Sequence, residues 1–151
     1  MTLTAKLMAV LAAVMALMAA PVMASEGEIE TKRIAFQVSD NNKGTMTKVL
    51  NNALNFSKAM TAAGHDYEIE IVAYNAGLHL FREDTSPVLE RVKNFQASVP
   101  NVTLSACGNT IKGMTKKEGK TPPLVSVARV VPGGVVRLME LDGEGYFVLR
   151  P

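Results

Sequence analysis

The sequence predicts one α/β domain with a mainly parallel five-stranded sheet and helices on both of its faces. Short apolar segments of strand length alternate with longer stretches in which apolar residues recur every three or four positions. Connections of about ten or more residues join successive strands in parallel through a crossover, which places helices over the sheet. No internal repeat or interdomain linker interrupts the pattern. The five predicted strands cover 33–38, 67–74, 102–107, 124–131 and 146–149.

The first half of the domain contains two strands separated by a long helix. The first strand, 33–38, ends in the polar cluster 39–42, which breaks it. From 45 to 63 the spacing of apolar residues predicts a helix with one buried face, and Gly64 is its natural stop. The next strand, 67–74, alternates at first and then becomes continuously apolar, as expected when the far end of a strand is buried. The chain then turns out of the sheet.

The second half repeats the alternation. Ser86 followed by Pro87 predicts a helix start, because serine caps helices and proline fits their first turn, and this helix is expected to run to about Ser98. The strand 102–107 leads into a lysine-rich, partly helical stretch, and 124–131 is a valine-rich strand. The remaining elements are a short helix opened by Pro132, Gly133 and Gly134, a turn at 142–145 and the last strand.

Residues 1–24 have the plan of a secretory signal peptide. Lys6 supplies a short basic start, 7–20 form an apolar run, and cleavage is expected after Ala24. The apolar run is shorter than the roughly 18–20 residues that cross a bilayer. Ser25, rather than a cysteine, follows the cleavage site, which argues against a lipoprotein anchor. We therefore expect a periplasmic protein with no membrane attachment after cleavage.

Removing the predicted leader leaves about 127 residues, which divide into a flexible N-terminus at 25–32 and a single domain at 33–151. Lys6 is the only charge lost, so 15 basic residues remain against 14 acidic ones. A nearly neutral domain has no excess charge with which to hold nucleic acid. It is also too short for a typical (β/α)8 barrel. One cysteine cannot build an internal disulfide framework.

Motifs for cofactors and metals fail on inspection. Gly108 and Gly113 have the spacing of a phosphate-binding loop, but Met114 and Thr115 occupy the places that need lysine and serine or threonine. No dinucleotide fingerprint follows a strand. The two histidines are far apart and lack a second cysteine, so a zinc site has too few ligands. We expect neither a cofactor nor a metal.

The candidate site lies where the strands end, because ligands of parallel sheets bind beyond the carboxyl ends of the strands. Cys107 closes the third predicted strand, and the backbone N–H groups of Gly108, Asn109 and Thr110 would favour its thiolate. Lys112 would attract an anionic substrate. The exit loop of the second strand adds Tyr74, Asn75 and His79 as further candidates.

Less specific interpretations of these residues stay open. A lone cysteine is often a small buried apolar residue, and a lysine run is often a solvated face; the lysines after Cys107 are Lys112, Lys116, Lys117 and Lys120. A Cys/His hydrolase would need His79 to approach Cys107. Glu68 and Glu70 share one face of a strand near its start, away from the candidate site, and we expect both to face solvent.

Four segments, taken in order, resemble the exported branch of the DsrE/DsrF-like family: IVAYNAGL at 71–78, VTLSACGNT at 102–110, VVPGGVV at 130–136 and GYFVLRP at 145–151. The resemblance covers the chain from about Arg33. It implies a three-layer α/β/α domain that assembles as a homo-oligomer, commonly a trimer or hexamer. In sulfur-relay members of the family, a cysteine at a strand end carries sulfur as a persulfide. Only Cys107 matches that cysteine here.

The first functional hypothesis is therefore a periplasmic sulfur-handling protein that carries sulfane sulfur on Cys107. Its partners would be small sulfur compounds or the thiol of a partner protein. The alternative is a non-catalytic oligomeric binding module in which Cys107 is only packed. A third hypothesis is a redox thiol that forms an intermolecular disulfide across an oligomer.

Overall fold

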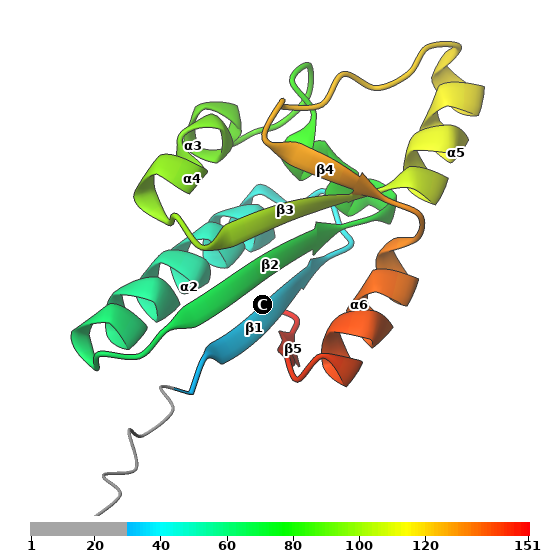
Figure 1. Ribbon diagram of the computed structural model, residues 1–151. Coiled ribbons are helices and arrows are strands. Elements are labelled where there is room, and N and C mark those ends of the chain that lie inside the picture. Colours follow the sequence, from blue (N-terminus) through cyan, green and yellow to red (C-terminus); the bar gives the residue numbers. More distant parts are fainter. Residues whose placement is uncertain (1–29) are drawn as a thin grey trace, which may run out of the picture.

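The computed structural model describes residues 30–151 and contains a five-stranded sheet in which every neighbouring pair of strands is parallel. The strands lie in the order β4-β3-β2-β1-β5 (Figure 1). The predicted α/β class is confirmed, and the sheet is wholly rather than mainly parallel. The strand bounds are β1 Lys32–Val38, β2 Tyr67–Ala73, β3 Val102–Cys107, β4 Ala128–Val131 and β5 Phe147–Leu149.

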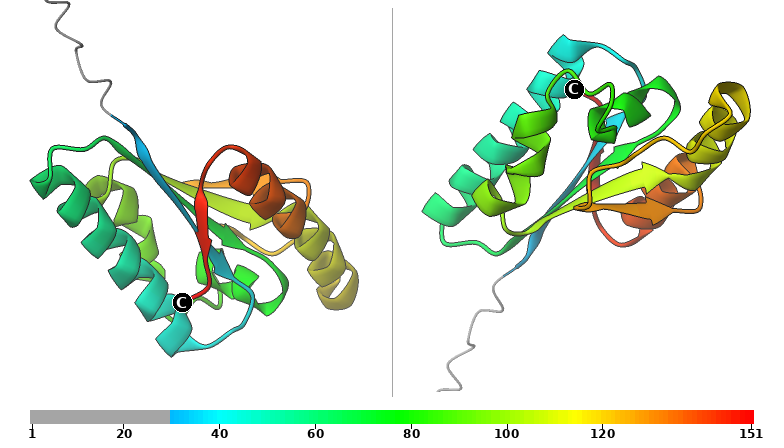
Figure 2. Two further views of the ribbon diagram at one scale, coloured as in Figure 1. Left: turned by 90° about the horizontal axis from the view of Figure 1, so that it is seen from below. Right: turned by 90° about the horizontal axis from the view of Figure 1, so that it is seen from above.

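Helices cover both faces of the sheet, which gives the three-layer α/β/α arrangement. In Figure 2, α2 (Lys43–Ala62), α3 (Leu89–Lys93) and α4 (Phe95–Ser98) lie on one side, and α6 (Gly134–Gly143) lies on the other. The 3-10 helix η1 (Asn75–Phe81) and α5 (Gly108–Glu118) follow β2 and β3 directly. The carboxyl ends of the central strands therefore lead into helices with almost no intervening loop.

The two faces of the sheet are packed unequally. The larger hydrophobic cluster lies on the α2 side and includes Phe36, Leu50, Ile71, Phe81 and Leu104. The cluster under α6 has only four buried members, Ala35, Val72, Leu138 and Leu141. Because α6 spans only part of its face, polar side chains occupy the rest of the sheet there.

The long helix α2 forms as the apolar spacing predicts. The side-chain oxygen of Asn42 caps its start by accepting a hydrogen bond from the Thr45 N–H at 3.1 Å. Met46, Val49 and Ala53 lie on its buried face. Gly64 follows the helix with a φ of 71°, the left-handed conformation that commonly ends helices.

Two local predictions were wrong, and two others were inexact. The predicted helix from Ser86 is two short helices that begin only at Leu89. The Ser86 hydroxyl donates to the Leu80 carbonyl at 2.9 Å and accepts the Val88 N–H at 3.4 Å, and both bonds lie in the turn before the first helix. The predicted strand 124–131 is regular only over β4, since Leu124 forms an isolated antiparallel bridge with Arg82. The chain leaves the sheet after β2 through η1, which begins at Asn75. The turn predicted at 142–145 is confined to 144–145, because α6 continues to Gly143.

The strand β1 begins at Lys32, one residue before the predicted strand 33–38. The predicted signal peptide at 1–24, and the part of the predicted flexible segment before residue 30, lie outside the described residues. Among the helices of residues 30–151, none has the length and apolar character needed to cross a membrane.

Candidate functional site

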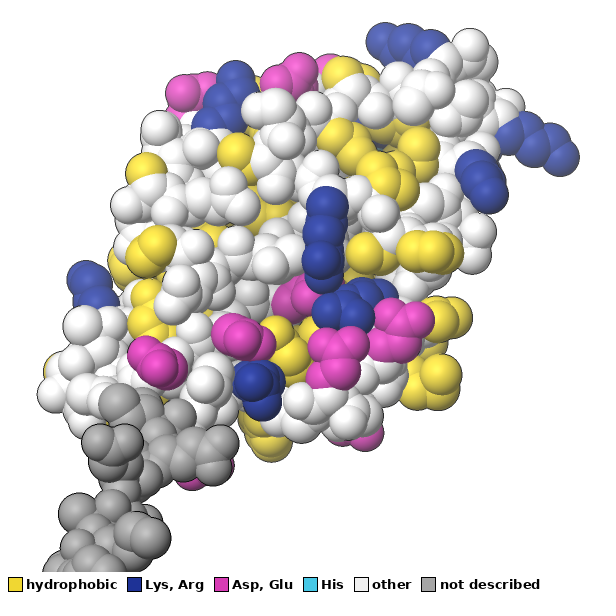
Figure 3. Space-filling model, in the orientation of Figure 1, with side chains coloured by type: hydrophobic (Ala, Val, Ile, Leu, Met, Phe, Trp, Pro, Cys, Tyr) yellow, Lys and Arg dark blue, Asp and Glu magenta, His cyan; other side chains and the backbone are white. Residues whose placement is uncertain are grey.

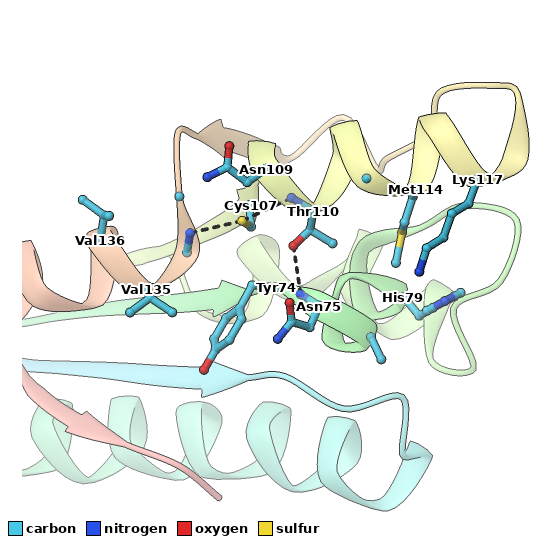
Figure 4. A pocket seen from close by; sticks show the side chains of 14 residues that line it. Tyr74, Asn75, His79, Cys107, Asn109, Thr110, Met114, Lys117, Val135 and Val136 are labelled. Carbon is cyan, nitrogen blue, oxygen red and sulfur yellow. Dashed lines mark hydrogen bonds between the residues drawn. The ribbon is translucent and has the colours of Figure 1, made fainter.

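The candidate site is built around the sulfur of Cys107, which lies between the first turns of two helices. Cys107 ends β3 and is also the N-cap of α5. Its Sγ accepts hydrogen bonds from the Thr110 N–H at 3.4 Å and the Gly134 N–H at 3.2 Å (Figure 4). Thr110 belongs to the first turn of α5, and Gly134 is the first residue of α6. The positive ends of both helices therefore meet at this sulfur.

Close backbone packing brings the two helix starts together. The Asn109 N–H donates to the Pro132 carbonyl at 3.2 Å, which ties the start of α5 to the connection before α6. A Cβ on Gly134 would lie 2.7 Å from the Cβ of Tyr74, and one on Gly108 would lie 3.0 Å from the Val131 carbonyl oxygen. Glycine at 134 thus lets its N–H approach the sulfur beside Tyr74.

The surroundings of Cys107 lower the pKa of its thiol below the ordinary value. Burial by itself raises this pKa, since it disfavours the thiolate. Hydrogen bonds from the Thr110 hydroxyl and from the backbone N–H groups of Thr110, Gly134 and Asn109 outweigh burial. The net effect favours the thiolate, which is the nucleophilic form of cysteine.

Thr110 links the cysteine to the loop after β2. Its Oγ1 accepts a hydrogen bond from the Asn75 N–H at 2.9 Å, so the hydroxyl proton stays free to be donated to the sulfur. Asn75 has a φ of 50°, in the left-handed region that asparagine adopts more readily than most residues. The bond from the Asn75 N–H to Thr110 joins the loop after β2 to the start of α5 at the carboxyl edge of the sheet.

A pocket of about 630 Å³ opens beside the sulfur. Cys107 is only 5% exposed, yet it belongs to neither hydrophobic cluster and lines this pocket. The sulfur is thus buried against backbone amides and a cavity, not among core leucines. The lining residues come from the ends of β2 and β3 and from η1, α5 and α6; besides Cys107 they include Tyr74, Asn75, His79, Asn109, Thr110, Met114, Lys117, Val135 and Val136 (Figure 4).

The structure brings most of the predicted site residues together. Cys107, Asn109, Thr110, Tyr74, Asn75 and His79 all line the one pocket, and Gly108 is the first residue of α5. Lys112 instead lines a neighbouring depression with Val130 and Pro132, and the lysine in the cysteine pocket is Lys117. His79 lies at the opposite end of the pocket from Cys107, and its Nδ1 is 2.7 Å from the Thr85 hydroxyl oxygen (Figure 4).

Sequence reasoning missed the contribution of α6. Gly134 supplies an N–H to the sulfur, while Val135 and Val136 line the pocket although both are more than half exposed. The available signal was the Pro132-Gly133-Gly134 sequence, which was assigned only to opening a helix. The approach of that helix to Cys107 depends on tertiary packing.

The prediction that Glu70 faces solvent was wrong, because its side chain is only 2% exposed. Its two carboxylate oxygens accept hydrogen bonds from the Ser105 hydroxyl at 2.6 Å, from Arg129 at 2.8 Å and from Arg137 at 2.9 and 3.0 Å. Burial raises the pKa of Glu70, but bonds from Arg137, Ser105 and Arg129 outweigh it and leave the pKa lowered. Glu68, by contrast, is half exposed, as expected.

Glu70, Ser105, Arg129 and Arg137 form a polar cluster, the Glu70 cluster, which lies beside α6 on the polar part of the sheet face. Figure 3 shows acidic and basic side chains gathered there, with hydrophobic side chains at the outer edge of α6. Arg137 of α6 reaches Glu70 and also pairs with Glu140 and Glu144, which explains why a strand residue far from α6 in sequence is buried. Within residues 30–151, no three His, Cys, Asp or Glu side chains are grouped so that they could hold a metal ion.

Comparisons with known proteins inform the fold only. No family model matches the chain, and no curated protein matches it. Among solved structures, it is similar to the protein of unknown function MTH1491 from Methanobacterium thermoautotrophicum, with a TM-score of 0.68 and 24% sequence identity. The match covers 80% of this chain and 99% of the other. The three-layer parallel fold is thus one that a solved protein also adopts.

Proposed function

We propose that this protein carries sulfane sulfur as a persulfide on Cys107. The observation that carries the proposal is the position of the Cys107 Sγ. This atom accepts hydrogen bonds from N–H groups at the starts of α5 and α6, and it borders a pocket. Two further points support it. The thiol pKa is lowered, and the sequence resembles the exported branch of the DsrE/DsrF-like family. The predicted export and homo-oligomeric assembly belong to the same proposal.

The reaction is a thiol–disulfide type of exchange. The Cys107 thiolate attacks the outer sulfur of a donor R–S–SH, a new Sγ–S bond forms, and the donor S–S bond breaks. The electron pair of that bond leaves with R–S⁻, and the outer sulfur keeps its proton as Cys107–S–SH. No external oxidant or reductant is required. An acceptor thiolate then takes the outer sulfur by the same exchange and returns Cys107 to its thiolate.

The lining residues stabilise the charged sulfur rather than remove a proton from it. The N–H groups of Thr110 and Gly134 and the Thr110 hydroxyl favour the thiolate before attack and after release. The persulfide extends into the pocket, where the amide of Asn109 is available as a donor. Sulfur exchange proceeds through the thiolate, whose share rises as the pKa of Cys107 falls, so the proposed step includes no general base such as His79.

Intact-mass spectrometry after incubation with inorganic polysulfide tests the proposal. We expect the wild-type chain to gain about 32 Da, one sulfur atom, and to lose it on addition of a small thiol. Cys107→Ser should gain nothing under the same conditions. An unchanged wild-type mass, or equal gains by both chains, would overturn the proposal.

A second candidate function is a non-catalytic binding module that assembles with itself. Two observations favour it: Cys107 is only 5% exposed, and α6 presents Val135, Val136 and Met139 with more than half of each side chain exposed. It predicts slow labelling of native Cys107 by a thiol reagent and unchanged oligomer size in Cys107→Ser. Rapid labelling in the folded state would reject the packed-thiol interpretation.

A further inference from the structure

The Cys107 pocket is chemically different at its two ends. At one end the sulfur faces the starts of α5 and α6, with Val135 and Val136 beside it. At the other end lie Lys117 and His79 (Figure 4). None of the lining residues is acidic. A ligand that spans the pocket therefore has one end beside a nucleophilic sulfur and the other end beside a cation.

The cation at the far end is not neutralised by the nearest acidic residue on its helix. Glu118 follows Lys117 in α5, but its carboxylate pairs with the buried guanidinium of Arg82 at 2.6 and 2.8 Å. The same arginine also holds Asp84 through two hydrogen bonds. Among the ion pairs of residues 30–151, none involves Lys117. No acidic side chain among these residues therefore competes with a ligand for Lys117.

The walls of the pocket suit a peptide-like body. Tyr74 near the sulfur and Met114 beside Lys117 supply apolar surface (Figure 4). Asn75 and Asn109 add two side-chain amides, each of which has donors and an acceptor. Among the side-chain hydrogen bonds of residues 30–151, none uses either amide, so both remain available for the amide groups of a ligand.

The separation of the two ends sets the length of the ligand. Lys117 lies ten residues after Cys107, so a helical rise of about 1.5 Å per residue places their backbones about 15 Å apart. Lysine side chains on a helix lean back toward its N-terminus, which shortens this span to about 10 Å. A chain of two or three sulfur atoms is too short to bridge it, whereas a short peptide thiol is long enough.

From this arrangement we infer that the sulfur donor is the persulfide of a short peptide thiol, with its sulfur at Cys107 and a carboxylate at Lys117. The inference rests on the proposed function and names the substrate class of that same site. In the transfer step, the outer sulfur of the donor moves to Sγ and the peptide thiolate leaves with the electron pair. The bound carboxylate holds the donor S–S bond beside the buried sulfur, which raises the rate of attack.

The test compares loading by glutathione persulfide with loading by the persulfide of glutathione diethyl ester, in which both carboxylates are neutral. We expect wild-type protein to be loaded about fivefold faster by the acid. Lys117→Gln should lose that preference and be loaded by the acid and the ester at similar rates. The matched control is Lys112→Gln, on the same helix but outside this pocket, which should keep the preference.

Equal loading of the wild-type chain by acid and ester would overturn the inference. So would a similar loss of preference in Lys117→Gln and Lys112→Gln, because the effect would then reflect net charge alone. Binding of S-methylglutathione to Cys107→Ser, followed by NMR, keeps the inference separate from the proposed function. No sulfur moves in that experiment, so binding that depends on Lys117 supports the peptide-thiol site even if polysulfide fails to load Cys107, and the absence of such binding rejects it.

Discussion

Cys107 and Glu70 are two buried ionisable groups on the same face of the sheet, yet their surroundings differ. Both oxygens of Glu70 are fully engaged, each accepting two hydrogen bonds from Ser105, Arg129 or Arg137. The Cys107 sulfur accepts hydrogen bonds from two backbone N–H groups and borders a pocket. Burial alone therefore does not mark a reactive group. The useful distinction is whether the protein occupies every side of the group or leaves one side to a ligand.

The groups that donate hydrogen bonds to Glu70 and to Cys107 differ in kind as well as in number. Glu70 is held by full guanidinium charges, which fix its position and neutralise it. Cys107 is held by backbone dipoles and a hydroxyl, which favour the thiolate without covering the sulfur. Glu70 thus ties α6 to the sheet, whereas Cys107 carries the sulfur in the proposed function. The predictions below separate these two roles.

The largest expected effect is on stability, from Glu70→Ala. Removing the carboxylate leaves Arg137 largely buried without its main partner, and loss of one member of a buried ion pair typically costs about 3–5 kcal/mol. Because Arg129 is half exposed, we expect about 3 kcal/mol less free energy of unfolding in urea. The control Glu68→Ala removes a half-exposed carboxylate and should cost less than about 1 kcal/mol. Equal losses in the two variants would refute the structural role of Glu70.

The stabilisation by Glu70 should also depend on pH. Its folded-state pKa lies below the ordinary value of 4.5, so its ionised form stabilises the folded chain above about pH 4.5 and this contribution is lost as the pH falls further. Wild-type protein should exceed Glu70→Gln in stability at pH 7, and the difference should shrink as the pH falls toward 3. Urea unfolding at several pH values measures it. A difference that stays constant would show that the carboxylate charge contributes nothing.

At the cysteine, the expected effect is on reactivity. Thr110→Val removes the hydroxyl that favours the thiolate, so the pKa of Cys107 should rise and labelling by iodoacetamide at pH 7 should slow about fivefold. Thr110→Ser keeps the hydroxyl and should label at nearly the wild-type rate. The pH dependence of the labelling rate reports the change in pKa directly. If both variants label alike, the hydroxyl has no influence on the sulfur.

The fold was predictable where local pattern decides it. Apolar runs bounded by polar or glycine-rich segments located β1, β2 and β3 to within a residue, and they placed Cys107 correctly at the carboxyl end of β3. The short elements were not predictable. The helix η1 depends on Gly77, where a Cβ would lie 2.1 Å from the Val38 carbonyl oxygen, and on the burial of Phe81. Those contacts join segments far apart in sequence.

The burial of Glu70 and the role of Gly134 escaped sequence reasoning for a single reason. Both depend on where α6 crosses the sheet, and α6 follows β2 by about 60 residues. Alternation along β2 shows that Glu68 and Glu70 share a face, but not how much of that face a helix covers. Likewise, glycines after a proline predict a helix start without showing what its first N–H donates to.

The smallest expected effect is on the stability of Cys107→Ala. The change removes one sulfur atom and leaves the N–H groups of Thr110 and Gly134 without their acceptor, which we expect to cost about 1 kcal/mol in urea unfolding. The pocket beside the sulfur lets water reach the freed N–H groups, so the loss stays well below that of Glu70→Ala. A loss as large as that of Glu70→Ala would instead show that the sulfur is a packed structural group. The binding-module function would then be the better explanation of this site.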